Sequence, residues 1–414
     1  GLAGSEAALR LSRAGVAVDL YEMRPAKLTP AHRSGRFAEL VCSNSLGSVE
    51  LTSGKGLLKG ELRILGSALL PIAEASRVPA GKALAVDREE FGRRVTEAVR
   101  SCPGIRVHEE EVKAIPGDRL VILACGPLAS DAIASAIRDV LGDDGFYFYD
   151  AISPIVDAGT IDPEASFVAD RYGVGTGDYL NLPMDRERYE AFLSALSTAR
   201  TVAPRAFEEP RYFEGCMPVE EIARRGPDTL LFGPLRPVGL RDPRTGRIPH
   251  AVVQLRKENA AGTMYNLVGF QTRLTYPEQK RVFSLIPGLS SAGYFRYGSV
   301  HRNSFLDARR HLHPWMESRW RTGLFFAGQI TGVEGYVESI ASGLVAAVSA
   351  LLRDAGKDPR PFPRESMIGA LMERITTPGP DRAQPMNANF GLLPEVDVRR
   401  KRDRKERKAE VALD

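Results

Sequence analysis

Two of the four cysteines lie in short polar segments of the kind that can hold a reactive thiol. Cys42 occurs in "LVCSNSLGS", a polar stretch with a glycine near its end, and Cys216 occurs in "FEGCMP", between a glycine and a Met-Pro turn. A thiolate that is accessible in such a segment can act as a nucleophile. Free cysteines are also among the residues most often buried, so a structural role is the alternative for each.

The chain opens on part of a nucleotide-binding turn, in "GLAGSEAALRLSRAGVAVDLYE". Gly1 and Gly4 match the second and third glycines of a GxGxxG turn, a helix is predicted from Ala3 to about Arg13, and Glu22 follows the strand "VAVDLY". In such a unit the glycines let the backbone approach a pyrophosphate and the acid accepts hydrogen bonds from a ribose. A preceding strand and the first glycine are expected upstream. Because half a fingerprint is a weak signal, an ordinary strand, turn and helix is the alternative.

The elements that would position these residues alternate between helix and strand. A helix is predicted at about 88–101, then a Pro-Gly turn and a strand that ends at Val112. In "RLVILACGPLASDAIASAI" a buried strand from Arg119 leads through Gly126 into another helix. This alternation predicts a doubly wound, Rossmann-like α/β domain.

A second glycine-rich turn near the end of the chain predicts that this domain is interrupted. The stretch "GLFFAGQITGVEGYVESIASGLVAAVSALL" indicates a short strand, a glycine-rich turn and a long helix of small residues. Since sheet segments occur at both ends, we predict one α/β domain from residues 1–165 and 300–414 and an inserted α+β domain at 166–299. Strands of the insertion are expected in "ARTVAPRAFEEPRYFEGCMP" and "AVVQLRKENAAGTMYNLVGFQTRL".

Charged and aromatic residues interleave in the insertion and just after it, as in "MYNLVGFQTRLTYPEQKRVF" and "GYFRYGSVHRNSF". A surface of this composition can stack bases and hold phosphates. The alternative is an amphipathic sheet whose aromatic side chains are buried.

Composition is that of a globular protein with room for two or three domains. The 414 residues are 43% hydrophobic and 26% charged, and no purely apolar run suggests a membrane span or a signal peptide, so a cytoplasmic location is expected. The four cysteines form no CxxC pair, the six histidines form no HExxH motif, and no Walker motif occurs. We therefore expect neither a metal site nor a P-loop.

Basic charge is concentrated in one run near the end of the chain, "RRKRDRKERK" at residues 399–408. The net charge of the whole chain is only +4. Such a run is usually a solvated helix face or a disordered arm, and contact with an RNA backbone is the functional alternative.

Several long segments together resemble one family. These are "ELVCSNSLGS", "YFEGCMPVEEIARRGPDTLLFGPLRPVGL", "QLRKENAAGTMYNLVGFQTRLTYPEQKRVF", "YGSVHRNSF" and "FFAGQITGVEGYVESIASGL". They resemble the folate- and FAD-dependent tRNA (uracil-5-)-methyltransferases, TrmFO, from Gly1 to about Pro394. The related wobble-uridine flavoproteins of the GidA type share mainly the glycine turns and have a long helical C-terminal region, for which the segment after Pro361 is short. They remain an alternative, as does a non-catalytic FAD-containing RNA-binding module.

The resemblance implies a GidA or glutathione-reductase type of FAD-binding domain and a specific reaction. Methylenetetrahydrofolate would supply the methylene, reduced FAD the hydride, and NADPH or NADH would reduce the flavin. The target would be the T-loop uridine in the T-arm of tRNA, swung out of its stack. Cys42 would add to carbon 6 of the uracil and Cys216 would help to remove the carbon 5 proton, although the two roles could be exchanged. A monomer is favoured.

The resemblance also implies which residues bind the cofactor and the substrates. Cys102 is expected to be structural and Cys125 to pack beneath the flavin. The cofactor residues would be Gly1, Leu2, Ala3, Gly4, Glu22, Val112, Gly126, Gly328, Gln329, Gly332, Glu334, Gly335 and Tyr336. Basic residues that could receive folate or tRNA are Arg224, Arg225, Lys257, Arg273, Lys280, Arg281 and Arg302.

Overall fold

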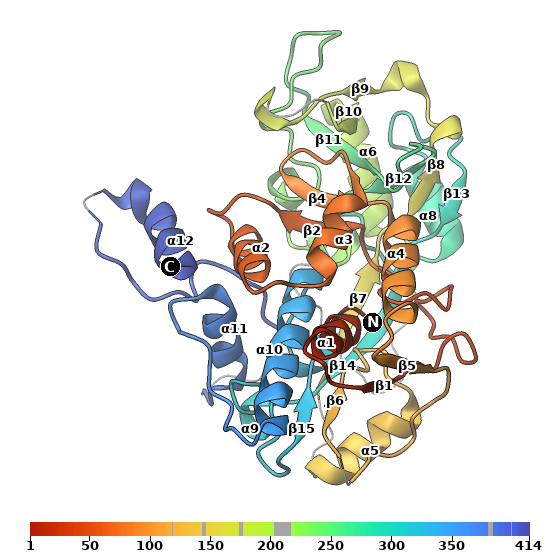
Figure 1. Cartoon of the computed structure of the whole chain (residues 1–414). Coiled ribbons are helices and arrows are strands. Elements are labelled where there is room, and N and C mark those ends of the chain that lie inside the picture. The colour runs from red at the N-terminus through yellow and green to blue at the C-terminus, as the bar shows by residue number, and fades with distance from the viewer. Residues whose placement is uncertain (118, 143–145, 174–176, 203–216, 380–383, 399) are drawn as a thin grey trace.

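The structure is a computed structural model of the whole chain. It describes all residues except 118, 143–145, 174–176, 203–216, 380–383 and 399, and it leaves aside the side chains of 146–150, 301, 302, 304 and 401. The predicted α/β character is confirmed, with helices and two kinds of sheet in one molecule (Figure 1).

The first domain contains parallel strands, as predicted for a doubly wound fold. One pair is β1 (Val18–Tyr21) with β5 (Ile105–His108), and the other is β6 (Val121–Leu123) with β15 (Leu324–Phe326). Helices connect or flank them: α1 (Leu2–Arg13), α4 (Arg88–Arg100), α5 (Asp131–Leu141) and α10 (Tyr336–Asp354). The predicted strand to Val112 ends earlier, at His108, because residues 109–117 include three successive acids and a proline and form a loop.

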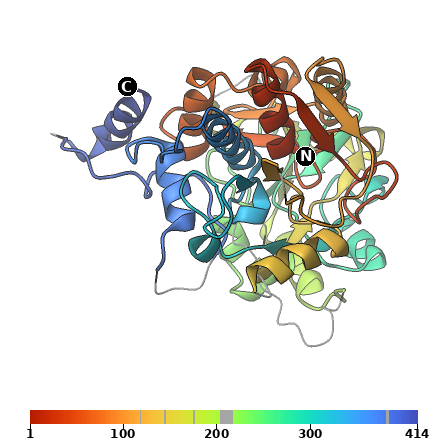
Figure 2. The same ribbon diagram turned by 60° about the horizontal axis from the view of Figure 1, so that its bottom comes forward.

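The core of this domain is built on the crossing of α1 and α10, which lie side by side in Figures 1 and 2. Helix α10 has the length and hydropathy of a membrane span, but 72% of that stretch is buried inside the protein. Its apolar character is therefore explained by packing on both sides, against α1 and against β15.

The second domain is organised around a six-stranded sheet in the order β13, β8, β12, β11, β10, β9. Its neighbouring strands are antiparallel. The strands are β8 (Ile155–Asp157), β9 (Phe167–Val168), β10 (Tyr179–Met184), β11 (Ala251–Lys257), β12 (Met264–Leu267) and β13 (Tyr294–Arg296), and the helices are α6 (Arg186–Ser197), α7 (Val219–Arg224) and α8 (Tyr276–Phe283). The second of the two predicted strand regions is confirmed as β11 and β12, whereas most of the first lies outside the described residues.

The six-stranded sheet of the second domain starts earlier in the chain than the inserted domain predicted at 166–299. Strand β8 lies before the predicted boundary at residue 166 and still belongs to the six-stranded sheet. Val156 and Ile161 also pack in the second hydrophobic core, with Phe192 and Phe270. The two cores are linked by an antiparallel pair, β7 (Phe146–Ile152) with β14 (Ser299–Phe305), which carries the chain out of the first domain and back.

Residues 45–86 add a small layer between the two domains. Strands β2 (Ser45–Ser48), β3 (Arg77–Val78) and β4 (Ala83–Val86) form a three-stranded sheet, next to helices α2 (Gly54–Ile64) and α3 (Leu69–Ala75). Ser53 caps α2 by accepting a hydrogen bond from Gly56 N, as expected for a serine at that position.

The end of the chain packs on this layer through α11 (Met367–Thr376) and α12 (Arg404–Leu413), and α9 (Ala308–His311) packs against α11. Helix α12 contains the second half of the basic run, residues 404–408, and extends from one side of the molecule (Figure 2). Lys408 in this run is only 5% exposed, and its ammonium group donates to Leu393 O at 3.0 Å. The part of the run in α12 is therefore docked on one side and charged on the other.

Candidate functional site

The amino end of α1 forms the first part of the site. The first hydrogen bond of the helix runs from Ser5 N to Gly1 O, at 3.0 Å. The N–H groups of Leu2, Ala3 and Gly4 precede it, so they have no acceptor within the helix. A Cβ added to Gly1 would meet no atom within 4 Å. An open helix end with free donors fits a phosphate group.

Glycines allow three backbone segments to meet at this helix. A Cβ on Gly4 would lie 3.3 Å from Ala124 Cβ, at the end of β6, and a Cβ on Gly328 would lie 3.1 Å from Ala3 Cβ. A Cβ on Gly343, in α10, would lie 2.4 Å from Ala3 O. The structure thus brings Gly1, Ala3, Gly4 and the later glycine turn together, as the sequence predicted.

Glu22 lies beside the same helix end, where an acid was predicted. Its Oε2 atom is 3.7 Å from Gly1 N. Arg24 Nε donates to Oε1 at 3.1 Å and Arg24 Nη2 donates to Oε2 at 2.9 Å. Burial would raise the pKa of Glu22, but the hydrogen bonds and positive charge around it outweigh burial and lower the pKa to about 2. The carboxylate is therefore ionised, and Oε2, which accepts one side-chain hydrogen bond, keeps a lone pair for a ribose hydroxyl.

The turn after β6 continues the same surface. Gly126 has a φ of +69°, and an added Cβ would meet no atom within 4 Å. Cys125 precedes it, and burial raises the pKa of this thiol to about 11, so it is a neutral packing residue at ordinary pH. Val112 packs against the edge of the first hydrophobic core.

The second glycine turn is held rigidly between β15 and α10. Gln329 Nε2 donates to Glu334 Oε2 at 2.6 Å. Met386 and the turn exchange two backbone hydrogen bonds, from Glu334 N to Met386 O and from Met386 N to Gly332 O, both 2.8 Å. Three residues of the turn have positive φ angles, which favour glycine: Gly328, Gly332 and Gly335.

Tyr336 joins this turn to the segment of Cys42. It is the first residue of α10, and its hydroxyl oxygen accepts hydrogen bonds from Cys42 N at 2.9 Å and from Ser43 N at 3.1 Å. Cys42 Sγ donates to Ala151 O, at 3.8 Å. Burial raises the pKa of Tyr336, so the hydroxyl stays protonated. The thiol is thus fixed next to the amino end of the helix that follows the glycine turn.

The next residues anchor the same segment on the second domain. Arg256 Nη2 donates to Ser43 Oγ and Arg256 Nε to Asn44 Oδ1, both at 2.9 Å. Asn44 Nδ2 donates to Lys257 O at 2.9 Å and to Val86 O at 3.0 Å. Cys42 therefore stands where the two domains meet.

Two guanidinium groups lie in the electrostatic surroundings of Cys42. Arg88 donates to Glu258 Oε2 through Nε at 3.0 Å and through Nη2 at 2.8 Å. Burial would lower the pKa of Arg88, but Glu258 more than compensates and the pKa is raised. Burial, with Arg88 nearby, lowers the pKa of Arg296 to about 10. Both groups remain cationic at neutral pH and interact electrostatically with Cys42.

Cys216 lies outside the described residues, so the structure does not place it. The described residues before and after this gap both form hydrogen bonds with one short segment of the second domain, residues 271–273. Val202 N donates to Arg273 O and Val219 N donates to Gln271 O, both at 2.7 Å.

The basic residues predicted for substrate binding differ in exposure. Arg273 is only 8% exposed, and its guanidinium contacts Glu221 at 3.3 Å and Thr201 Oγ1 at 3.2 Å, which suits a structural tie. Arg281 is half exposed and pairs with Glu278 at 2.6 Å. Arg224, Arg225 and Lys280 are exposed, and Lys257 is half-buried. Arg302 lies on β14 opposite Tyr149, and its side chain is outside the described part.

Sequence reasoning missed four residues that hold the Cys42 segment or surround it with charge: Arg88, Asn44, Arg256 and Arg296. Asn44 and Arg256 are buried polar residues that contact each other across the domain junction. A polar residue in a polar segment carries no sign of burial. The one usable signal was the three-residue run "SNS" directly after Cys42, whose side chains favour local backbone contacts.

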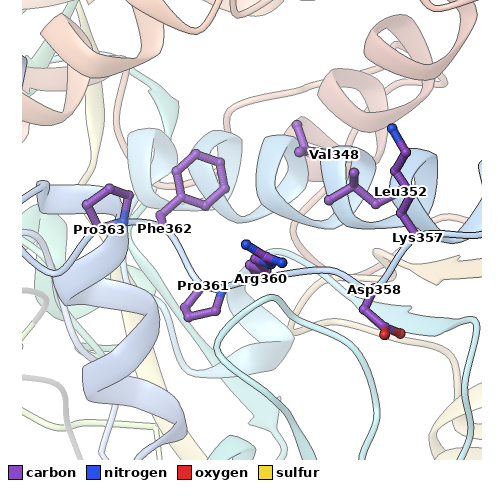
Figure 3. A pocket seen from close by; sticks show the side chains of 8 residues that line it. All are labelled: Val348, Leu352, Lys357, Asp358, Arg360, Pro361, Phe362 and Pro363. Atoms are coloured by element: carbon purple, nitrogen blue, oxygen red, sulfur yellow. The ribbon is translucent and has the colours of Figure 1, made fainter.

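A surface pocket of about 590 Å³ lies elsewhere (Figure 3). It is lined by Val348 and Leu352 of α10, by Lys357 and Asp358, and by residues 360–363. Val348 is twelve residues from Tyr336, which corresponds to roughly 18 Å along a helix. The pocket is therefore separate from the glycine turns. Among the described residues, no cluster of His, Cys, Asp or Glu could hold a metal.

These features define a two-domain α/β protein of the dinucleotide-binding type, with a thiol at the domain junction. The model of one family, "Glucose inhibited division protein A" or GidA, matches residues 1–358. Two crystal forms of Aquifex aeolicus GidA have similar structures: each has a TM-score of 0.71 over 100% of this chain, at 19% and 18% sequence identity, and 72% and 75% of the GidA chain is covered.

Closer relatives carry a more specific name. The chain is 56% identical to a protein of Symbiobacterium thermophilum and 52% identical to proteins of Sulfurihydrogenibium and Enterococcus faecalis. Each match covers 100% of this chain and 94% or 95% of the relative. All three relatives are named methylenetetrahydrofolate–tRNA-(uracil-5-)-methyltransferase TrmFO. The chain therefore belongs to the GidA family and, within it, to the TrmFO proteins.

Proposed function

We propose that this chain methylates carbon 5 of a uracil in tRNA, with methylenetetrahydrofolate as the one-carbon donor and FAD as cofactor. The observation that carries the proposal is the position of Cys42, which is held by Tyr336 directly beside the second glycine turn. The full-length similarity to the TrmFO relatives supports the same reaction.

The residues present fit an FAD molecule. The open end of α1 offers N–H donors to a pyrophosphate, Glu22 offers a carboxylate to a ribose, and the turn around Gly332 faces the start of α10. Reduced FAD supplies the hydride that converts a methylene to a methyl group. The chain supplies binding, orientation and the thiol.

Cys42 supplies the nucleophile that activates carbon 5 of the uracil. The thiolate adds to carbon 6, and carbon 5 then gains enolate character and can attack the methylene carbon. Arg88 and Arg296 place positive charge near the sulfur, where an anion must form. The Tyr336 hydroxyl accepts hydrogen bonds from the backbone N–H groups of Cys42 and Ser43, and the Asn44 side chain donates to Val86 O. These bonds fix the backbone of the segment, which favours an attack geometry that is set before the substrate binds.

Finer parts of the proposal follow from the family resemblance. Cys216 helps to remove the carbon 5 proton, NADPH or NADH reduces the flavin, and the target is the T-loop uridine. Exposed bases such as Arg224 and Lys280 contact tRNA phosphates. The protein acts as a monomer in the cytoplasm.

The experiment is a methyl-transfer assay on a T-arm RNA hairpin, with labelled methylenetetrahydrofolate and a reductant. The wild-type protein is expected to be yellow and to label the RNA. Cys42→Ala should keep the flavin absorbance and lose turnover by more than about 1,000-fold, because a nucleophile is removed.

The matched control is Cys102→Ala. Cys102 is also a free cysteine, but its Sγ lies 3.0 Å from Ser12 Oγ, against α1, so this variant should retain full turnover. Labelling that depends on S-adenosylmethionine, or full activity of Cys42→Ala, would refute the proposal.

A further inference from the structure

Three tyrosine rings of the second domain form a continuous stack. Tyr276 lies on Tyr297 with ring centroids 4.9 Å apart and an interplanar angle of 20°, and Tyr297 lies on Tyr294 at 4.8 Å and 16°. Offset stacking at such distances is a favourable geometry for aromatic rings. The rings come from the start of α8 and from β13 together with the residue that follows it; α8 and β13 are neighbours in Figure 1.

The two ends of the stack differ. Tyr276 is 58% exposed, so the outer end of the stack is open to a ligand. The hydroxyl of Tyr294, at the inner end, is buried and has no hydrogen-bond partner among the described residues. Burial raises the pKa of Tyr294, so its hydroxyl stays protonated and the inner end of the stack is uncharged.

The stack lies next to the segment that contacts Cys42. Tyr297 precedes Gly298, and a Cβ on Gly298 would lie 2.7 Å from Ile152 O. Ala151, one residue earlier, accepts the contact from Cys42 Sγ. Arg296, the residue before Tyr297, interacts electrostatically with Cys42. Ala151 and Ile152 therefore lie against both the Cys42 thiol and the residue that follows Tyr297.

One basic residue lies beside the exposed ring, and others lie farther along the same helix. Lys280 is exposed and lies one turn after Tyr276 on the same face of α8. Arg200 and Arg281 both pair with Glu278, at 3.5 and 2.6 Å, which leaves an excess of basic groups. A nucleobase brings a phosphate on each side of it, so an aromatic face with basic neighbours suits a nucleotide chain.

We infer that the open face of Tyr276 stacks a base of the tRNA strand next to the target uracil. This inference rests on the proposed function, because it assumes an RNA substrate. The ring holds the strand while the neighbouring base lies at the thiol, and the selectivity of such stacking is for an unpaired, accessible base rather than for one base type.

The test measures the binding of a T-arm RNA hairpin by fluorescence anisotropy, without folate, at one fixed salt concentration. Tyr276→Leu should raise the Kd by about 5- to 150-fold, the range expected for the loss of one base-aromatic stack. Tyr276→Phe keeps the ring and should stay within about twofold of wild type. Phe232→Leu is the control for an exposed aromatic of the same domain, because Phe232 is 84% exposed and belongs to no stack among the described residues.

Two further readouts separate the possible roles of the ring. The KM for methylenetetrahydrofolate should be unchanged in Tyr276→Leu, and the slope of log Kd against log salt should be unchanged, whereas Lys280→Ala should reduce that slope. An unchanged Kd in Tyr276→Leu would overturn the inference, and so would a changed folate KM with an unchanged Kd. Because binding is measured without turnover, failure of the methyl-transfer assay would be seen separately.

Discussion

The hydroxyl of Tyr336 is a single atom that connects the cofactor turn to the Cys42 segment. It accepts two backbone hydrogen bonds, from Cys42 and from Ser43. We predict that Tyr336→Phe lowers kcat by about 10- to 100-fold, because two N–H groups lose their acceptor and the thiol is no longer held in place. Steady-state methyl transfer measures this, and the flavin absorbance should persist.

Tyr189→Phe is the matched control for that variant. The Tyr189 hydroxyl donates to Pro227 O at 2.5 Å in the second domain, and no residue of the Cys42 segment takes part. Its loss should lower the free energy of unfolding by about 1 kcal/mol with kcat unchanged. Equal kcat values for Tyr336→Phe and wild type would show that the hydroxyl does not position the thiol.

Residue types and spacing could predict some of these contacts and not others. Gly1, Gly4 and Glu22 were predictable because a phosphate turn requires them at fixed spacing, and the structure places them together. Arg296 could not be predicted. Its relation to Cys42 depends on where a distant strand packs, and an arginine in a basic, aromatic segment is equally consistent with a solvated surface.

At the scale of elements, α2 supplies a cap for α11. Glu61, in α2, accepts hydrogen bonds from Met367 N at 2.5 Å and from Ile368 N at 2.8 Å, in the first turn of α11. Glu61 is 4% exposed, and burial raises its pKa from 4.5 to about 7 in spite of these bonds. The folded protein therefore binds a proton at Glu61 that the unfolded chain has lost between pH 4.5 and 7.

The raised pKa predicts how stability depends on pH. The contribution of Glu61 to the free energy of unfolding is fully present below pH 4.5, where the carboxyl group is protonated in both states. It is lost as the pH rises to about 7, because the unfolded chain then releases this proton whereas burial makes ionisation costly in the folded protein. The loss is about 3 kcal/mol in all. Glu61→Gln should therefore gain stability relative to wild type between pH 5 and 7.5, as measured by urea unfolding at both pH values.

A control carboxyl group makes this pH prediction specific. Glu365 is exposed and lies just before α11, and Glu365→Gln should show no such relative gain. A constant difference in the free energy of unfolding between Glu61→Gln and wild type across pH 5 to 7.5 would contradict the assignment.

Helices were the most predictable elements, and their surroundings explain why. The apolar stripe of α1 and the small residues of α10 are needed because the two helices cross closely at Gly343, and that requirement is visible in the sequence. The basic run was less predictable. Its charges indicate solvent, but α12 is docked through Lys408 and Ala409, whose burial depends on backbone carbonyls supplied by an earlier segment.

At the scale of the whole molecule, the site belongs to neither domain alone. Tyr336 of the first domain holds one side of the Cys42 segment, and Arg256 and Lys257 of β11 hold the other. The sequence predicted two domains because sheet segments recur at both ends of the chain. It could not predict their junction, since the polar residues that meet there are far apart in the chain and have no local periodicity.

The ion pair between Arg88 and Glu258 is a buried charged contact of that junction. Glu258 is 2% exposed, so Arg88→Met would leave a buried carboxylate without its partner. We predict that this variant loses about 3–5 kcal/mol of stability, measured by urea unfolding. The double variant Arg88→Met/Glu258→Leu should recover most of this loss, because no buried charge remains.

Activity should separate the two roles of Arg88. Its charge also interacts with Cys42, so methyl transfer by the double variant should stay at least about 10-fold below wild type although its stability has returned. Arg353→Met is the control, because it breaks a comparable pair with the buried Glu317, at 2.8 Å, away from the thiol, and should lose stability while the folded enzyme keeps its kcat. Recovery of kcat together with stability in the double variant would show that Arg88 only joins the domains and does not assist the thiolate.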